Sequence, residues 1–164
     1  MGPHWLDAIF NPGAIAVVGA SENVEGVGGR VFRNLISGGY AGDVIPVNPK
    51  YETVQGRRCY AALDEVETPV DLAVIATPAK VVPDIVRQCG EQRIGGAVVL
   101  SAGFGETGEA GRGLEARLLD AARHADLRFV GPNCLGVMRP GIGLNATFLD
   151  KGAPAGRLAL VSQS

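Results

Sequence analysis

The stretch Ala14-Ile15-Ala16-Val17-Val18-Gly19-Ala20-Ser21 determines the fold class of this chain. Its first five residues are apolar without polar alternation, which predicts a strand buried on both faces. A glycine cluster at Gly26, Gly28 and Gly29 follows, and apolar residues then recur at helical spacing as far as Ile36. A strand, a glycine-rich turn and a helix in this order predict the first unit of a doubly wound α/β domain.

The same alternation continues along the chain. Four further apolar runs read as strands and two further periodic segments as helices, at residues 44–47, 72–76, 97–100 and 128–130 and at residues 81–89 and 114–122. Short connections between them predict a Rossmann-type, mostly parallel sheet with helices on both faces. The link between the second and third strands is the exception, because only residues 61–66 have a helical pattern there.

The composition of the sequence changes near its C-terminal end. Residues 131–156 are rich in Gly, Pro and Asn, which favours an ordered loop and a linker. Residues 158–161 read as a sixth strand, followed at once by small polar residues. We therefore expect one domain over residues 1–140, and over residues 141–164 a linker and the first strand of a second, truncated domain.

Composition excludes several classes of protein. The 164 residues carry a net charge of −2, whereas nonspecific nucleic-acid binders need a surplus of cations. No apolar run approaches the roughly 20 residues of a membrane-spanning helix. The three cysteines form no C-x-x-C pair, and no metal-ligand cluster is visible. We expect a cytoplasmic protein that binds neither nucleic acid nor a membrane and holds no metal.

The turn after the first strand is a predicted phosphate or pyrophosphate site, with Gly19, Ser21, Gly26 and Gly28 as its residues. Its spacing departs from G-x-G-x-x-G, because Ser21 stands at the second glycine position and four residues separate it from Gly26. The loop is thus longer than in standard NAD domains. The alternative is a glycine-rich turn that serves chain reversal alone.

The end of the second strand distinguishes between ligands. NAD sites place a carboxylate there for the ribose 2′-hydroxyl, but this strand leads into Asn48, Pro49 and Lys50. The ammonium of Lys50 suits a phosphorylated ribose, which is the 3′-phosphate of coenzyme A (CoA) or the 2′-phosphate of NADP. A solvated lysine in a turn is the other interpretation.

The remaining strands end in small and polar residues, and ligands of open α/β sheets lie beyond those ends. The third strand supplies Thr77 and Pro78, and the fourth supplies a run that comprises Ser101, Ala102, Gly103 and Phe104. Phe104 either lines an apolar slot for a pantetheine arm or is a core aromatic residue.

The fifth strand is followed by Asn133 and Cys134. A nucleophilic Cys134 needs a base, and the chain has only His4 and His124. We predict no catalytic residue in the chain.

These motifs together resemble a known family. They occur in order along nearly the whole chain, namely Gly19-Ala20-Ser21 with Gly26 and Gly28, residues 46–50, 71–78, 101–104, 131–136, 143–148 and 160–164. The pattern is similar to the CoA-binding domain of NDP-forming acyl-CoA synthetases, which are related to the α subunit of succinyl-CoA synthetase.

The resemblance implies an enzyme that makes a thioester from an acid, CoA and ATP or GTP through an acyl phosphate and a phosphohistidine. It implies CoA contacts at Ser21, at residues 48–50 and at residues 101–104, with Asn133 near the thiol end. ATP or ADP would bind only to other synthetase domains or to a β-type subunit, and the phosphorylated histidine would also lie beyond this chain. We expect the chain alone to bind CoA and to catalyse nothing.

Two alternatives remain open from the sequence. The same domain set occurs fused to a GNAT acetyltransferase in bacterial protein lysine acetyltransferases, where it is a regulatory CoA-binding module. The third hypothesis is an NADP-binding Rossmann domain, since Lys50 suits either phosphorylated ribose.

Overall fold

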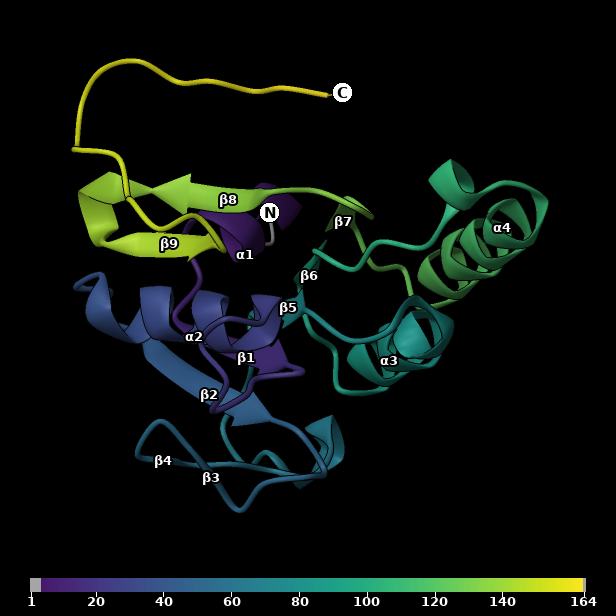
Figure 1. Ribbon diagram of the computed structural model, residues 1–164, viewed down its shortest axis with the longest axis horizontal. Helices are drawn as coiled ribbons and strands as arrows, with labels where there is room; N and C mark the ends of the chain where they lie inside the picture. Colours follow the sequence, from purple (N-terminus) through teal and green to yellow (C-terminus); the bar gives the residue numbers. More distant parts are fainter. Residues whose placement is uncertain (1–3, 164) are drawn as a thin grey trace.

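A computed structural model describes residues 4–163, and its centre is a five-stranded parallel sheet (Figure 1). The strand order is β2-β1-β5-β6-β7. The strands are β1 (Ala14–Val18), β2 (Asp43–Val47), β5 (Leu72–Ile75), β6 (Gly96–Val99) and β7 (Phe129–Val130). The predicted Rossmann-type α/β fold is confirmed, and the first five expected strands each lie within one residue of their predicted ends.

Helices cover both faces of this sheet, because successive residues of the central strands point to opposite sides (Figure 1). Ile15 and Val17 of β1 join the apolar cluster that includes α1 (Trp5–Phe10) and α2 (Val27–Ser37). Ala16 and Val18 join the cluster beneath α3 (Val82–Glu91) and α4 (Glu109–His124). The strands are therefore buried from both sides, as their continuous apolar sequence predicts.

The expectation of an ordered loop and a linker over residues 131–156 is wrong in part. An antiparallel hairpin forms there from β8 (Gly136–Arg139) and β9 (Leu144–Thr147). Its turn ends at Gly143, whose φ of 71° suits glycine. Buried Val137, Leu144 and Ala146 attach it to the α2 side of the sheet. The dense Gly and Pro around these short strands hid their alternation.

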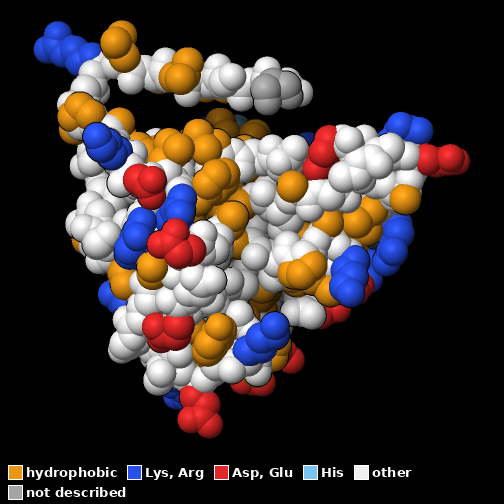
Figure 2. Space-filling view, in the orientation of Figure 1, with side chains coloured by type: hydrophobic (Ala, Val, Ile, Leu, Met, Phe, Trp, Pro, Cys, Tyr) orange, Lys and Arg blue, Asp and Glu red, His pale blue; other side chains and the backbone are white. Residues whose placement is uncertain are grey.

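The predicted strand at residues 158–161 is also absent. This segment has no regular structure, and Leu158, Leu160 and Val161 are 100%, 91% and 94% exposed. Figure 2 shows the tail standing away from the body of the domain. A strand needs a partner for its backbone hydrogen bonds, and no strand of the described residues lies beside this one. The proposed division of the chain near residue 140 stays a prediction.

The link from β2 to β5 contains more structure than the sequence indicated. A second hairpin, β3 (Thr53–Val54) and β4 (Arg57–Arg58), precedes the short 3-10 helix Leu63–Glu65. Tyr60 pairs with Val47 at the end of β2, which attaches the link to the edge of the sheet. The link therefore lies beside the end of β2, close to the expected ligand site.

Candidate functional site

The strand order of the sheet reverses between β1 and β5, and ligands of such sheets bind at this point beyond the carboxyl ends of the strands. A cavity of about 390 Å³ opens here. It is lined by Val27, Ala76, Thr77, Leu100, Ser101, Ala102, Asn133, Cys134, Leu135 and Phe148. The structure thus brings together four of the predicted site residues, which come from the ends of three strands.

The turn after β1 depends on glycines, because it leaves no room for a side chain at two positions. Gly19 has a φ of +94°, and a Cβ there would lie 2.7 Å from the carbonyl oxygen of Ala76. A Cβ on Gly28 would lie only 1.9 Å from the carbonyl oxygen of Gly19. Strand and helix therefore touch at two glycines, which brings the start of α2 close to any ligand over the sheet.

The start of α2 keeps its backbone donors available. Its N-cap residue, Gly26, offers no side chain to accept a hydrogen bond from the first turn. The N–H groups of that turn have no partner inside the helix, and the helix dipole favours an anion beside them. This geometry suits the phosphate or pyrophosphate expected from the sequence.

Ser21 and Asn48 hold the loop between β1 and α2. The hydroxyl of Ser21 accepts a hydrogen bond from the backbone N–H of Asn23 at 3.1 Å and lies 3.2 Å from the hydroxyl of Tyr51. The Nδ2 atom of Asn48 donates to the carbonyl oxygen of Ala20 at 2.8 Å. Asn48 thus joins the end of β2 to the first turn, a structural role that the sequence did not indicate.

Lys50 follows β2 in a turn stabilised by Asn48, whose Oδ1 atom accepts the backbone N–H of Lys50 at 3.0 Å. Pro49 and Lys50 are exposed, and no carboxylate of the described residues lies within 4.0 Å of the Lys50 ammonium. A ligand phosphate would therefore not have to displace an internal partner.

Thr77, at the end of β5, carries a buried hydroxyl that the described residues leave without a hydrogen-bond partner. A buried polar atom without a partner costs free energy, so such atoms are rare in native proteins. Thr77 also lines the cavity, whereas Pro78 is exposed and precedes a short 3-10 helix. The Thr77 hydroxyl is thus an unused hydrogen-bonding group beside the cavity.

The loop after β6 contains Phe104, for which the sequence left two interpretations open. Its side chain is fully buried in the core beneath α3 and α4, so it is a core aromatic residue and lines no slot. Ser101 is 7% exposed, with its hydroxyl 3.5 Å from the carbonyl oxygen of Ile75. Gly103 has a φ of +111°, which turns the loop across the sheet.

Two carboxylates that sequence reasoning missed hold this loop. Glu106 accepts the N–H of Gly103 at 2.6 Å and that of Phe104 at 3.1 Å, and Glu115 accepts the N–H of Gly105 at 2.9 Å. The bond from Gly103 is the main cause of the lowered pKa of Glu106. These three N–H groups are already paired, so they are not donors for a ligand anion. The sequence signal for this contact was Glu106, which stands three residues after Gly103.

The loop after β7 contributes Asn133 and Cys134 to the cavity. The N–H of Asn133 donates to the carbonyl oxygen of Ser101 at 2.9 Å, which joins the ends of β6 and β7. Burial raises the pKa of Cys134, and its Sγ atom lies 3.3 Å from the carbonyl oxygen of Val99. Neither His4 nor His124 lines the cavity. Cys134 therefore lacks both the base and the lowered pKa of an activated nucleophile.

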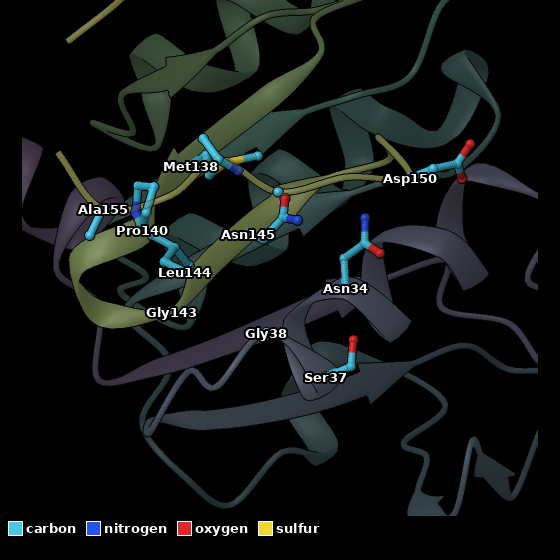
Figure 3. A pocket seen from close by; sticks show the side chains of 12 residues that line it. Asn34, Ser37, Gly38, Met138, Pro140, Gly143, Leu144, Asn145, Asp150 and Ala155 are labelled. Atoms are coloured by element: carbon cyan, nitrogen blue, oxygen red, sulfur yellow. The ribbon is translucent and has the colours of Figure 1, made fainter. Parts of the chain in front are cut away.

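A second cavity, of about 250 Å³, lies between α2, the β8–β9 hairpin and the start of the tail (Figure 3). Beside it the Nδ2 atom of Asn34 donates to the carbonyl oxygens of Thr147 and Leu149, each at 2.8 Å. The sequence-predicted site residues are all absent from its lining. We treat it as the place where the hairpin and tail are attached to α2.

No group of three or more His, Cys, Asp or Glu side chains in residues 4–163 is arranged to hold a metal ion. None of the helices in that range is long and apolar enough to span a membrane.

Comparison with known proteins identifies relatives. The α subunit of an ADP-forming acetate–CoA ligase from Pyrococcus furiosus is 44% identical over 159 residues, which are 97% of this chain and 34% of the relative. An ADP-forming 4-hydroxybutyrate–CoA ligase from Nitrosopumilus maritimus is 37% identical over 95% of this chain and 22% of its own length. The chain spans about a third or less of these proteins.

A solved structure of a CoA synthetase is also similar to this chain. A dinucleotide-forming acetyl-coenzyme A synthetase from Ca. Korarchaeum cryptofilum, in complex with phosphate and ADP, matches with a TM-score of 0.82 and 40% identity. The match covers 87% of this chain and 30% of that one. The family model of the CoA binding domain matches residues 13–140, which include the sheet and all the predicted contact residues. This chain therefore belongs to the CoA-binding domain family.

Proposed function

We propose that the chain binds CoA across the carboxyl ends of β1, β2, β5 and β6. The diphosphate would lie at the start of α2, the adenosine 3′-phosphate beside Lys50, and the pantetheine arm along the cavity at the ends of β5 to β7. The observation that carries this proposal is the exposed ammonium of Lys50 at the end of β2, where an NAD site has a carboxylate. Membership of the CoA-binding domain family supports it.

The residues present fit such a ligand. The uncapped first turn of α2 suits the diphosphate, and the Thr77 hydroxyl suits a polar group of the arm. The paired N–H groups at residues 103–105 make the end of β6 unsuitable for an anion. Because the free donors lie at the start of α2, the charged end of the ligand would lie there. The neutral arm would lie over β5 and β6. Bound CoA would supply the thiol on which a thioester forms.

We infer that the chain is the CoA-binding part of an NDP-forming acyl-CoA synthetase. The names of the relatives, which are ADP-forming CoA ligases, support this. Such an enzyme makes the thioester from an acid, CoA and a nucleoside triphosphate through an acyl phosphate and a phosphohistidine. His4 caps α1 and His124 lies exposed at the end of α4, so neither suits that role. The nucleotide site and the phosphohistidine would belong to the remaining synthetase domains or to a β-type subunit.

Calorimetry with four ligands tests the proposal. We expect the 164-residue chain to bind CoA, to bind dephospho-CoA more weakly, and to show no heat with NAD at millimolar concentration. NADP distinguishes the dinucleotide alternative, because tight NADP binding without CoA binding would assign the chain to that class. Tight NAD binding would contradict the interpretation of Lys50.

A further inference from the structure

The hairpin of β3 and β4 reaches from the end of β2 to the turn after β1. Its two strands pair over two residues each, and its turn consists of Gln55 and Gly56. Val54 is fully buried in the same apolar cluster as α2. The hairpin is therefore packed against the domain and does not project into solvent.

Gln55 binds the glycine-rich turn through its side chain and its backbone. Its Nε2 atom donates to the carbonyl oxygen of Ser21 at 3.0 Å and to that of Gly29 at 2.9 Å. Its backbone N–H donates to the Oε1 atom of Glu22 at 2.6 Å. One residue of the hairpin thus bridges both sides of the loop that leads from β1 into α2.

The backbone of Gln55 has a conformation that glycine would adopt with less strain. Its φ is 47°, in the left-handed region, and Gly56 follows with a φ of 80°. On backbone grounds alone, glycine would be favoured at position 55, but the chain has a glutamine there. Such an outlier indicates a use for the side chain, and the hydrogen bonds to Ser21 and Gly29 are that use.

Two more side chains of the same segment hold the same loop. Asn48 donates to the carbonyl oxygen of Ala20, and the Tyr51 hydroxyl lies 3.2 Å from that of Ser21. Three side chains of residues 48–55, a segment that begins directly after β2, therefore hold the turn.

We propose that Gln55 is a positioning residue for the anion-binding turn, with residues 48–55 setting its shape before the ligand arrives. The inference rests on the proposed function, since the diphosphate of CoA is the anion concerned. The C=O and N–H of a trans peptide point in opposite directions, so a Ser21 carbonyl held by Gln55 also fixes the N–H of Glu22. A turn fixed in advance loses less conformational entropy on binding. Gln55 itself does not touch the ligand.

The test compares two variants of Gln55 with a control in the same turn. Gln55→Gly removes the side chain and relieves the backbone, and Gln55→Glu presents oxygens to the two carbonyls. We expect Gln55→Gly to weaken CoA binding by about 5- to 150-fold, the range for two lost neutral hydrogen bonds. Gln55→Glu should weaken it further, because its carboxylate also repels the two carbonyl oxygens and the diphosphate of the ligand. The control is Gly56→Asn, because a Cβ at Gly56 meets nothing within 4 Å and Asn is less strained than most residues at its φ of 80°. The backbone strain should cost some stability, which the control measures separately from the loss of the Gln55 contacts. It should bind CoA as the parent does.

Two readouts separate positioning from general stability. Adenosine 3′-phosphate 5′-diphosphate, the nucleotide half of CoA, should lose the same factor in affinity as CoA. In the ligand-free Gln55→Gly chain, amide hydrogen exchange should accelerate at residues 21–30 and stay unchanged in α3 and α4.

Three outcomes would contradict the positioning role of Gln55. Gln55→Gly binding CoA within twofold of the parent would overturn the inference, and so would a loss for CoA without a matching loss for its nucleotide half. A parent chain that binds no CoA would instead refute the proposed function, and the inference with it.

Discussion

Removing the ammonium of Lys50 should weaken CoA binding by about 5- to 30-fold. The magnitude follows from its surroundings, because an exposed charge acts through a dielectric constant near that of water. One pair of unit charges about 4 Å apart then contributes roughly 1 kcal/mol, and a phosphate near −2 about twice that. Roughly 1–2 kcal/mol corresponds to that range of affinity.

The assay is a double-mutant cycle by calorimetry, with CoA and dephospho-CoA against the parent and Lys50→Ala. Removing either the phosphate or the ammonium should cost a similar factor, and removing both should cost little more, because the two changes delete one interaction. The loss should shrink as salt rises, since exposed charges are screened. Arg128→Ala removes an exposed cation before β7, at the opposite end of the strands, and should change neither affinity.

Strictly additive losses would show that Lys50 and the 3′-phosphate do not meet. The next cations to consider would then be Arg30, Arg57 and Arg58. Arg30 is the weakest of these candidates, because its guanidinium already lies 3.5 Å from Glu25 and 3.6 Å from Asp150. The fold would stand, but the assignment of the β2 end would not.

Four further results are expected. Gly28→Ala should lower the free energy of unfolding in urea by about 2–3 kcal/mol, because its Cβ would lie 1.9 Å from the Gly19 carbonyl oxygen, whereas Gly113→Ala, in open space on α4, should raise it by about 0.5–1 kcal/mol. Thr77→Val should raise the free energy of unfolding by about 1 kcal/mol by removing an unpaired buried hydroxyl, and should weaken CoA binding about fivefold; unchanged CoA affinity would exclude Thr77 from the site. Burial raises the pKa of Cys89 from 9.0 to about 12, so in that interval only the unfolded thiol is ionised and stability should fall by up to about 1.4 kcal/mol per pH unit; an equal slope in Cys89→Ala would show another cause. The pure chain should form no acyl-CoA from acid, CoA and ATP, and measurable turnover would redirect attention to His124 and Cys134.

The sheet was predictable from the sequence because its strands are continuous apolar runs. Leu72–Ile75 and Gly96–Val99 are buried on both faces, so their composition alone marks them as central strands. The hairpin β8–β9 was missed because it is short and surrounded by glycine and proline. The strand expected at residues 158–161 is not formed in this structure, since an apolar run has strand propensity but forms a strand only beside a partner, and its place in a second domain stays a prediction.

The candidate site was predictable where position in the fold determines it. Thr77, Ser101 and Asn133 follow three parallel strands, so topology brings them to one edge. Side-chain direction was not predictable, and Phe104 points into the core. The contacts of Gln55 were not predictable either, because they join residues far apart in the sequence. The hairpin that makes them is also too short to produce a periodic pattern.

The contact between Gly19 and Gly28 leaves no room for a side chain where the first strand meets the first helix. In the proposed site, this part of the chain faces the group that all nucleotide cofactors share, and it carries nothing that could tell one from another. Discrimination is left to residues 48–58, in a link outside the central sheet. A lineage could thus exchange one cofactor for another by rewriting that link while the central scaffold stayed intact. Attempts to re-engineer ligand preference have the same natural starting point.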